Sequence, residues 1–165
     1  MMRKIMSNLK QQLEKLDISK LKMKNGNSVE KELKEHSKIL ADCIMESLDR
    51  VYESYNPSVY RRTYGLYDSL YIYNKVRIDV SAKGVSLSIR LSFDDRANHP
   101  NFYGEESNVA NLINEGWKWE NGVHIPYLSE RSGTHFIEKG IEEYKRRVKN
   151  PFAVKFTINN EIRMF

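Results

Sequence analysis

The sequence predicts an α+β fold in which long N-terminal helices pack on a small, mostly antiparallel β-sheet. Three observations lead to this prediction. Apolar residues recur every three to four positions through the first third of the chain, and every second position after residue 75. The helical spacing returns over residues 136–148, and a strand-like segment closes the chain. Helices followed by a hairpin, a helix in the C-terminal half and a final strand are typical of an α+β domain.

The length and composition indicate one folded domain. The chain has 165 residues, of which 40% are hydrophobic and 30% charged, and this is enough to bury a core. We expect a single domain over residues 1–165, with an N-terminal helix and loop over 1–26 and an α+β core over 27–165. The 27 Lys and Arg against 22 Asp and Glu give a net charge of +5, which permits contact with polyanions without requiring it.

Two helices are predicted before the strands. The first is a short amphipathic helix over residues 5–16. The second begins at Asn27 or Ser28, with Glu30 placed to complete a capping box on Asn27. Its apolar stripe continues for about seven turns until Pro57 interrupts the pattern. A helix of this length needs another surface to cover its apolar stripe.

The strands are predicted from alternation. Apolar residues alternate from Val76 to Val80 and again from Val85 to Phe93, which predicts an antiparallel hairpin with one buried face. Turn-forming residues over 94–106 predict an exposed loop. Near the end, alternation over residues 154–158 predicts a final strand that joins the hairpin.

The C-terminal half contains two predicted helices. Ser107 is expected to cap a short helix through Ile113, and Gly116 to end it. Thr134 is expected to cap the last helix, which stops before Pro151. The aromatic-rich stretch between these two helices is predicted to be irregular.

The sequence gives little support for catalysis. Cys43 falls within an apolar helical stripe and is expected to be buried, and the four histidines lack metal-ligand spacing. We therefore expect no enzyme activity, metal or cofactor. One alternative is a metal-dependent hydrolase centred on Asp94, Asp95 and His99, although polar loops after strands commonly carry such residues. Without a signal peptide or a membrane span, we expect an intracellular protein with no membrane contact.

Two sets of residues are candidates for binding. Lys145, Arg146, Arg147 and Lys149 match the dipole at the end of the last helix, but they could also contact phosphates. Trp117 and Trp119 could stack on bases, although tryptophans in such a loop more often anchor it or meet a protein partner. A basic nucleic-acid-binding protein therefore remains an alternative function.

The junction "YNPSVYRRTYGLYDSL" resembles the segment that follows the long N-terminal helix in small neck and tail-completion proteins of tailed bacteriophages. The resemblance rests on Tyr-x-Pro, Arg62-Thr63, Leu66 and Ser69, and further on "NEGWKW" and "GTHFIEKGIEEYKRR". It extends over roughly residues 28–158. Two features depart from the family pattern, since Tyr64 separates Thr63 from Gly65 and Thr134-His135 replaces a proline.

This resemblance implies a structural virion protein of the head-tail junction, not an enzyme. Such a protein forms a homo-oligomeric ring, of about six or twelve subunits, that connects the capsid portal side to the tail. The implied partners are other neck, portal-adaptor or tail-terminator proteins and non-specific DNA in the channel. The implied location is the virion, and the host cytoplasm during assembly.

The resemblance also assigns roles to the residues singled out above. The expected subunit or partner interface consists of Tyr60, Arg61, Arg62, Tyr64, Tyr67, Trp117 and Trp119. The possible DNA-channel contacts are Lys145, Arg146, Arg147 and Lys149.

Overall fold

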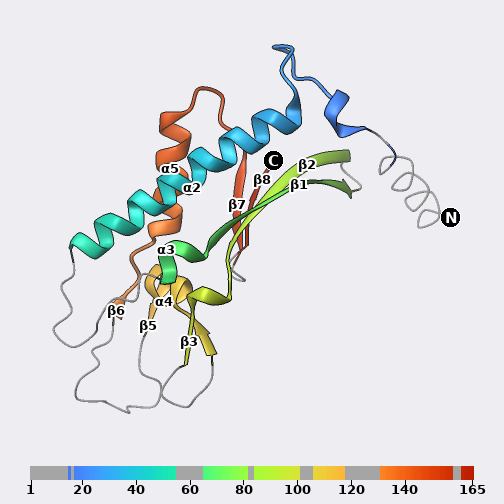
Figure 1. Cartoon of the computed structure of the whole chain (residues 1–165). Helices are drawn as coiled ribbons and strands as arrows, with labels where there is room; N and C mark the ends of the chain where they lie inside the picture. The colour runs from blue at the N-terminus through green and yellow to red at the C-terminus, as the bar shows by residue number, and fades with distance from the viewer. Residues whose placement is uncertain are drawn as a thin grey trace, which may run out of the picture.

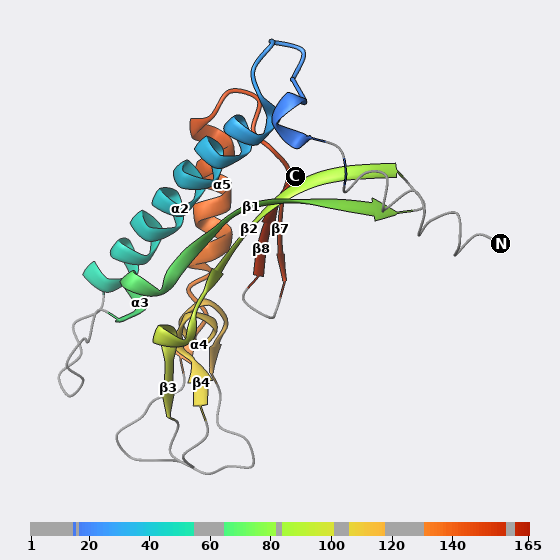
Figure 2. The same ribbon diagram turned by 45° about the vertical axis from the view of Figure 1, so that its right-hand side comes forward.

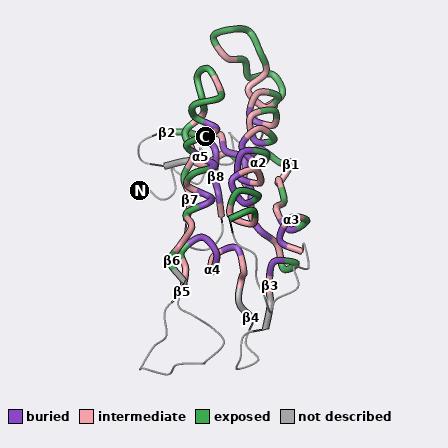
Figure 3. The backbone as a smooth tube through the Cα atoms, turned by 90° about the vertical axis from the view of Figure 1, so that its left-hand side faces the viewer, coloured by how far each residue is buried: buried purple, intermediate pink, exposed green. Residues whose placement is uncertain are grey.

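The computed structural model describes residue 15 and residues 17–54, 65–81, 84–100, 106–117, 131–157 and 161–165. Two helices, α2 (Val29–Glu53) and α5 (Phe136–Arg147), lie against each other and cover one face of a four-stranded antiparallel sheet (Figure 1). Buried residues gather where α2, α5 and the sheet meet (Figure 3). This arrangement confirms the predicted α+β fold.

The sheet has the strand order β1-β2-β8-β7. The predicted hairpin is confirmed as β1 (Leu70–Ser81) and β2 (Gly84–Phe93). The strand predicted over residues 154–158 is confirmed as β7 (Val154–Thr157), but a second strand that was not predicted, β8 (Glu161–Met164), follows it. β8 pairs with β2 and leaves β7 at the edge. Buried Ile162 and Met164 place β8 inside the core, so it is β8 that gains the inner position.

The start of α2 differs from the predicted capping box. The N-cap residue is Ser28, which makes no side-chain capping bond. Glu30 instead pairs with Lys34, with 2.6 Å between its Oε1 and the lysine Nζ, while the side-chain amide of Asn27 donates to Glu32. Opposite charges one turn apart stabilise a helix by a few tenths of a kcal/mol, about as expected for such a pair. The helix ends at Glu53, a few residues before the predicted stop.

We call the contact between the two long helices the α2–α5 seam. A Cβ added at Gly140 would lie 2.6 Å from the Cα of Ile44, so the helices approach as closely as only a glycine allows. Tyr144 is fully buried in the seam, with its hydroxyl 2.8 Å from His36 Nδ1. Cys43 is only 1% exposed, which confirms its predicted place in the core.

The helix α4 (Val109–Glu115) begins one residue later than predicted. Asn108, not Ser107, is the N-cap, and its Oδ1 accepts a hydrogen bond from the Ala110 amide at 3.0 Å. Asn and Ser are similarly good capping residues, so propensity did not separate the two neighbours. Gly116 ends the helix with a φ of 81°, as predicted.

The first turn of α5 is capped from a distance. Thr134 was the predicted cap, but its hydroxyl donates to the Ile113 carbonyl at 2.7 Å, and the N-cap position is taken by His135 at a φ of 51°. The side chain of His135 makes no capping bond. The fully buried Asn114 of α4 supplies it instead, because its Oδ1 accepts from the Ile137 amide at 2.9 Å.

Short elements connect these parts (Figures 1 and 2). The predicted exposed loop after β2 contains the 3-10 helix η2 (Asp95–Ala97) and a small sheet of β3 (Asn98–Pro100) and β4 (Glu106–Asn108). Ala97 is 2% exposed, so this part of the prediction is wrong: an apolar side chain draws the segment onto the core.

The remaining helices and strands are short. The helix α3 (Gly65–Ser69) precedes β1, and a two-stranded sheet joins β5 (Gly116–Trp117) to β6 (Arg131–Ser132). A 3-10 helix, η1 (Ile18–Lys20), precedes α2. The helix predicted over residues 5–16 lies outside the described residues except for Lys15.

Candidate interaction surfaces

The tyrosine-rich junction is described only from Gly65 onwards. Tyr60, Arg61, Arg62 and Tyr64 lie outside the described residues. Tyr67 on α3 stacks near Tyr52 of α2, with 5.4 Å between ring centroids, and its hydroxyl donates to Asp49.

The described contacts of Tyr67 therefore fasten α3 to the C-terminal part of α2. They lie within one chain, and the predicted role of Tyr67 at a subunit or partner interface stays a prediction. Leu66 and Ser69, on the same helix, are buried. Their burial supports the view that part of the junction closes the core.

The predicted tryptophan anchor is described only in part. Trp117 ends β5, where its backbone pairs with Arg131 of β6, and Trp119 lies outside the described residues. The backbone pairing holds the start of the aromatic-rich stretch against its end. The role of the two tryptophans at an interface stays a prediction.

The basic end of α5 divides into two kinds of residue. Arg147 makes a bidentate contact with Glu46 of α2, at 3.0 and 2.7 Å, and Arg146 pairs with Glu143. The hydrogen bond from Arg147 lowers the pKa of Glu46, and the one from Arg146 lowers the pKa of Glu143.

Lys145 and Lys149, the other two predicted channel contacts, are exposed and form no ion pair within the described part of the chain. The two arginines are thus engaged within the subunit, and the two lysines are the ones available to a phosphate. The four residues do not form one uniform patch.

The carboxylate of Asp94 is occupied by an arginine. Its Oδ2 lies 2.6 Å from Arg96 Nη2, and its Oδ1 accepts from the Arg96 amide at 2.9 Å. These hydrogen bonds lower the pKa of Asp94. Among the described residues, no three His, Cys, Asp or Glu side chains gather where a metal could bind, and the His99 side chain is not described. The described geometry gives Asp94 the role of a cap for η2.

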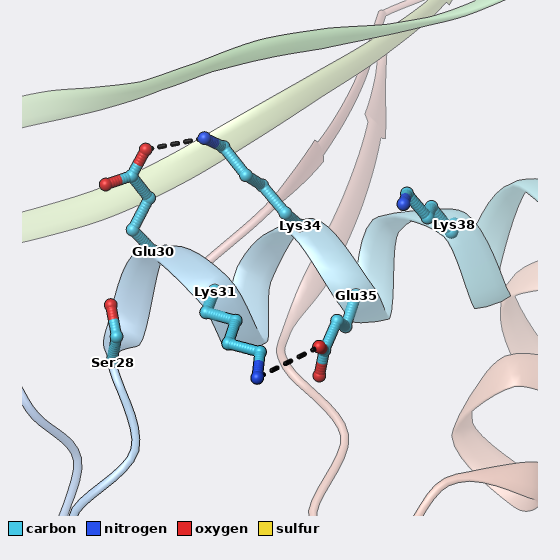
Figure 4. Close-up of a pocket in the computed structure, with 6 residues that line it drawn as sticks. All are labelled: Ser28, Glu30, Lys31, Lys34, Glu35 and Lys38. Atoms are coloured by element: carbon cyan, nitrogen blue, oxygen red, sulfur yellow. Dashed lines mark hydrogen bonds and ion pairs between the residues drawn. The ribbon is translucent and has the colours of Figure 1, made fainter. Parts of the chain in front are cut away.

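A shallow hollow on the first turns of α2 is lined by charged side chains (Figure 4). Glu30 pairs with Lys34, and Lys31 with Glu35 at 3.8 Å, each one turn apart. Alternating charges that pair along a helix are typical of a solvated face. Within the described residues, none of the helices is long and apolar enough to cross a bilayer.

The outer face of the sheet, opposite the helices, carries a cluster that the sequence reasoning missed. The strand registers place Tyr73, Arg90, Arg163 and Lys155 in a single row across β1, β2, β8 and β7. We call Arg90, Arg163 and Lys155 the cation row. Alternation along β2 was a usable signal, because Arg90 lies between buried Ile89 and Leu91 and must therefore point away from the core.

Local contacts hold part of this row in place. The guanidinium carbon of Arg90 lies 3.7 Å from the centroid of the Tyr73 ring. Glu161, in the neighbouring row, is 3.3 Å from Arg90 and also pairs with Arg163. Lys155 has no ion pair within the described residues. One carboxylate therefore serves two of the three cations.

The described fold and surfaces define a small α+β protein with tyrosines where α2 meets α3 and with tyrosines and cations on the outer face of its sheet. A comparison with protein families identifies the kind of protein more closely. The chain belongs to the YomN family, a phage-derived family whose model matches residues 5–159. The protein is thus phage-associated. No curated protein and no solved structure matches the chain.

Proposed function

We propose that this protein is a non-enzymatic structural component of the virion at the head-tail junction, where it forms a ring between the capsid portal side and the tail. The observation that carries the proposal is the match to a phage-derived family over residues 5–159. The resemblance of the junction at residues 55–70 to phage neck proteins supports a role at the head-tail junction in particular.

The sheet topology supports assembly into a ring. A closed ring with one repeated contact needs two unlike surfaces on each subunit, one for each neighbour. The four-stranded sheet ends in two unlike edges, the 12-residue strand β1 and the 4-residue strand β7. An edge strand offers unpaired backbone amides and carbonyls to a neighbouring chain.

The partners in this proposal are copies of the chain itself and other neck, portal-adaptor or tail-terminator proteins. Tyrosine and arginine are favoured anchors of such interfaces, and the junction is rich in both. The protein would act in the mature virion and assemble in the host cytoplasm.

Deleting the gene from the phage or prophage tests the proposal. We expect lysates with filled heads and complete tails that are not joined, as seen by electron microscopy. Supplying the intact gene on a plasmid should restore joined particles, and this is the matched control. Normally joined particles in the deletion strain would contradict a head-tail role. Joined particles of altered tail length would point to a different tail function.

A further inference from the structure

We propose that the outer face of the sheet binds single-stranded nucleic acid, with phosphates on the cation row and a base on Tyr71. This inference goes beyond the proposed structural function and does not depend on it. It rests on the charges, the exposed ring and the shape of the face.

The charges on this face are unbalanced. Arg163 lies directly opposite Arg90 on one side and Lys155 on the other. Like charges directly opposite each other destabilise a sheet. Glu161 pairs with the two arginines, while Lys155 has no ion pair among the described residues. A phosphate chain laid along the row would replace this repulsion with attraction.

The rest of the face does not remove the imbalance. Arg77 and Asp79 point to the same side of β1, and Asp79 accepts a hydrogen bond from Ser88 at 2.8 Å. Four cationic side chains, Arg77 and the cation row, therefore share the described face with two carboxylates, Asp79 and Glu161. The excess of two positive charges favours a polyanion.

The aromatic residues favour a single strand over a duplex. Tyr71 is 47% exposed and is one of four exposed large hydrophobic residues in the described part of the chain. Its ring meets that of Tyr73 edge-on at 4.9 Å, and Tyr73 is itself held by Arg90. Aromatic side chains beside cations bind single strands by stacking on bases. In a duplex the base faces are already stacked and leave the tyrosine no partner.

The dimensions of the face suit an extended strand. The cation row crosses three strands, and neighbouring strands lie about 4.8 Å apart, so it spans roughly 10 Å. This exceeds the rise of one nucleotide, about 3.4 Å along a strand of B-form DNA. Among the described elements, the helices α2 and α5 cover the opposite side of the sheet (Figure 2).

Fluorescence anisotropy with the full chain tests the proposal. The probes are labelled oligothymidine of about 16 nucleotides and a duplex of equal length, each titrated at several salt concentrations. The test variant combines Arg163→Gln and Lys155→Gln. Its matched control combines Lys145→Gln and Lys149→Gln, which removes the same charge from the end of α5.

We expect the intact protein to bind the single strand more tightly than the duplex. The sheet variant should lose at least about tenfold in affinity, and its salt dependence should fall by roughly 1.4, since each phosphate contact to a single strand contributes about 0.7. The α5 variant should bind nearly normally. Tyr71→Ala should weaken single-strand binding by about tenfold and leave any duplex binding unchanged.

Four results would overturn the proposal. They are no single-strand binding at low salt, tighter binding of the duplex, equal losses in the two double variants, and a change in self-association in place of a change in binding. Circular dichroism verifies that each variant is folded. If the double sheet variant is not, Lys155→Gln alone replaces it, because Lys155 is exposed and unpaired among the described residues. A negative outcome leaves the head-tail proposal standing, since gene deletion tests that separately.

Discussion

The helical side of the molecule and the outer face of its sheet differ in how their polar and charged groups are paired. In the α2–α5 seam, Arg147 binds Glu46 with two hydrogen bonds, and the Tyr144 hydroxyl contacts both His36 and the Phe152 amide. On the outer face, cations of three adjacent strands lie opposite one another. The seam pairs these polar groups within the subunit, whereas the described outer face keeps an excess of positive charge.

This difference shows that the placement of charges is more informative than their number. The net charge of +5 does not distinguish an arginine that joins two helices from one that faces another cation. Charges that the subunit already pairs contribute to its stability. Cations that lie opposite other cations are the better candidates for binding, because an anionic partner would replace their repulsion with attraction.

The largest effect on stability is expected from a substitution that forces the α2–α5 seam apart. Gly140→Val would drive a branched side chain into the backbone of α2, since even a Cβ at this position lies 2.6 Å from Ile44 Cα. We expect a loss of about 3 kcal/mol or more in the free energy of unfolding, measured by urea denaturation. The adjacent exposed change Lys139→Val should cost about 0.5 kcal/mol. Equal losses in the two variants would show that the close approach is unimportant.

The next largest effect is expected from removing the Asn114 side chain, which caps α5 from α4. Asn114→Ala leaves the buried Ile137 amide without its acceptor. We expect a cost of about 1–3 kcal/mol, measured as a shift in the urea midpoint at constant slope. Glu115→Ala, an exposed change at the next position, is the control and should alter stability by less than about 0.5 kcal/mol. If Asn114→Ala behaves like this control, α5 finds another cap.

A smaller effect on stability is expected for the loss of Arg147 at the end of α5, and this effect should depend on pH. The pKa values of Glu46 and Glu143 are lowered, so their contribution to stability is complete above the ordinary carboxyl pKa and is lost as pH falls through the lowered values. Arg147→Gln should therefore lower the thermal midpoint at pH 7 and have a smaller effect at an acid pH below the lowered pKa values.

Lys145→Gln provides the matched comparison for this pH dependence. Lys145 has no carboxylate partner among the described residues and interacts with the helix dipole, which does not titrate. Its small destabilisation should persist in acid. An effect of Arg147→Gln that is equally large at both pH values would contradict a role for the Glu46 and Glu143 carboxylates.

The smallest effect has the opposite sign. Lys155→Gln removes one charge from the cation row, and we expect it to stabilise the fold by a few tenths of a kcal/mol. Lys149→Gln removes a charge near the end of α5 that also has no ion pair among the described residues, and it should destabilise by about 0.3 kcal/mol. Thermal unfolding at low salt compares the two. A destabilising Lys155→Gln would remove the argument from repulsion.

The sequence predicts this fold where the signal is local. Helical spacing predicted α2 and α5, and alternation predicted the hairpin of β1 and β2. The cap of α5 was missed because Asn114 lies on a different helix, and nothing in the first turn of α5 points to it. The strand β8 was missed because only two apolar residues, Ile162 and Met164, alternate within it, whereas three alternating residues predicted β7.

The cation row could not be read from the sequence in the same way. The cation row comes from three strands, β2, β8 and β7. More than half of the residues from β1 to β8 lie between β2 and the other two strands. Only the register of β2 with β8 and of β8 with β7 brings them into line. The orientation of Arg90 was predictable from its strand, but its neighbours were not.

The hydrogen bond from the Ile137 amide to Asn114 also affects the local unfolding of α4 and α5. Because the acceptor belongs to α4, the first turn of α5 loses its cap whenever α4 leaves the core. We therefore expect any local opening of α4 to expose the Ile137 amide, so its proton should exchange with solvent at least as fast as α4 opens. A helix of seven residues would then limit the protection of the first turn of a longer one.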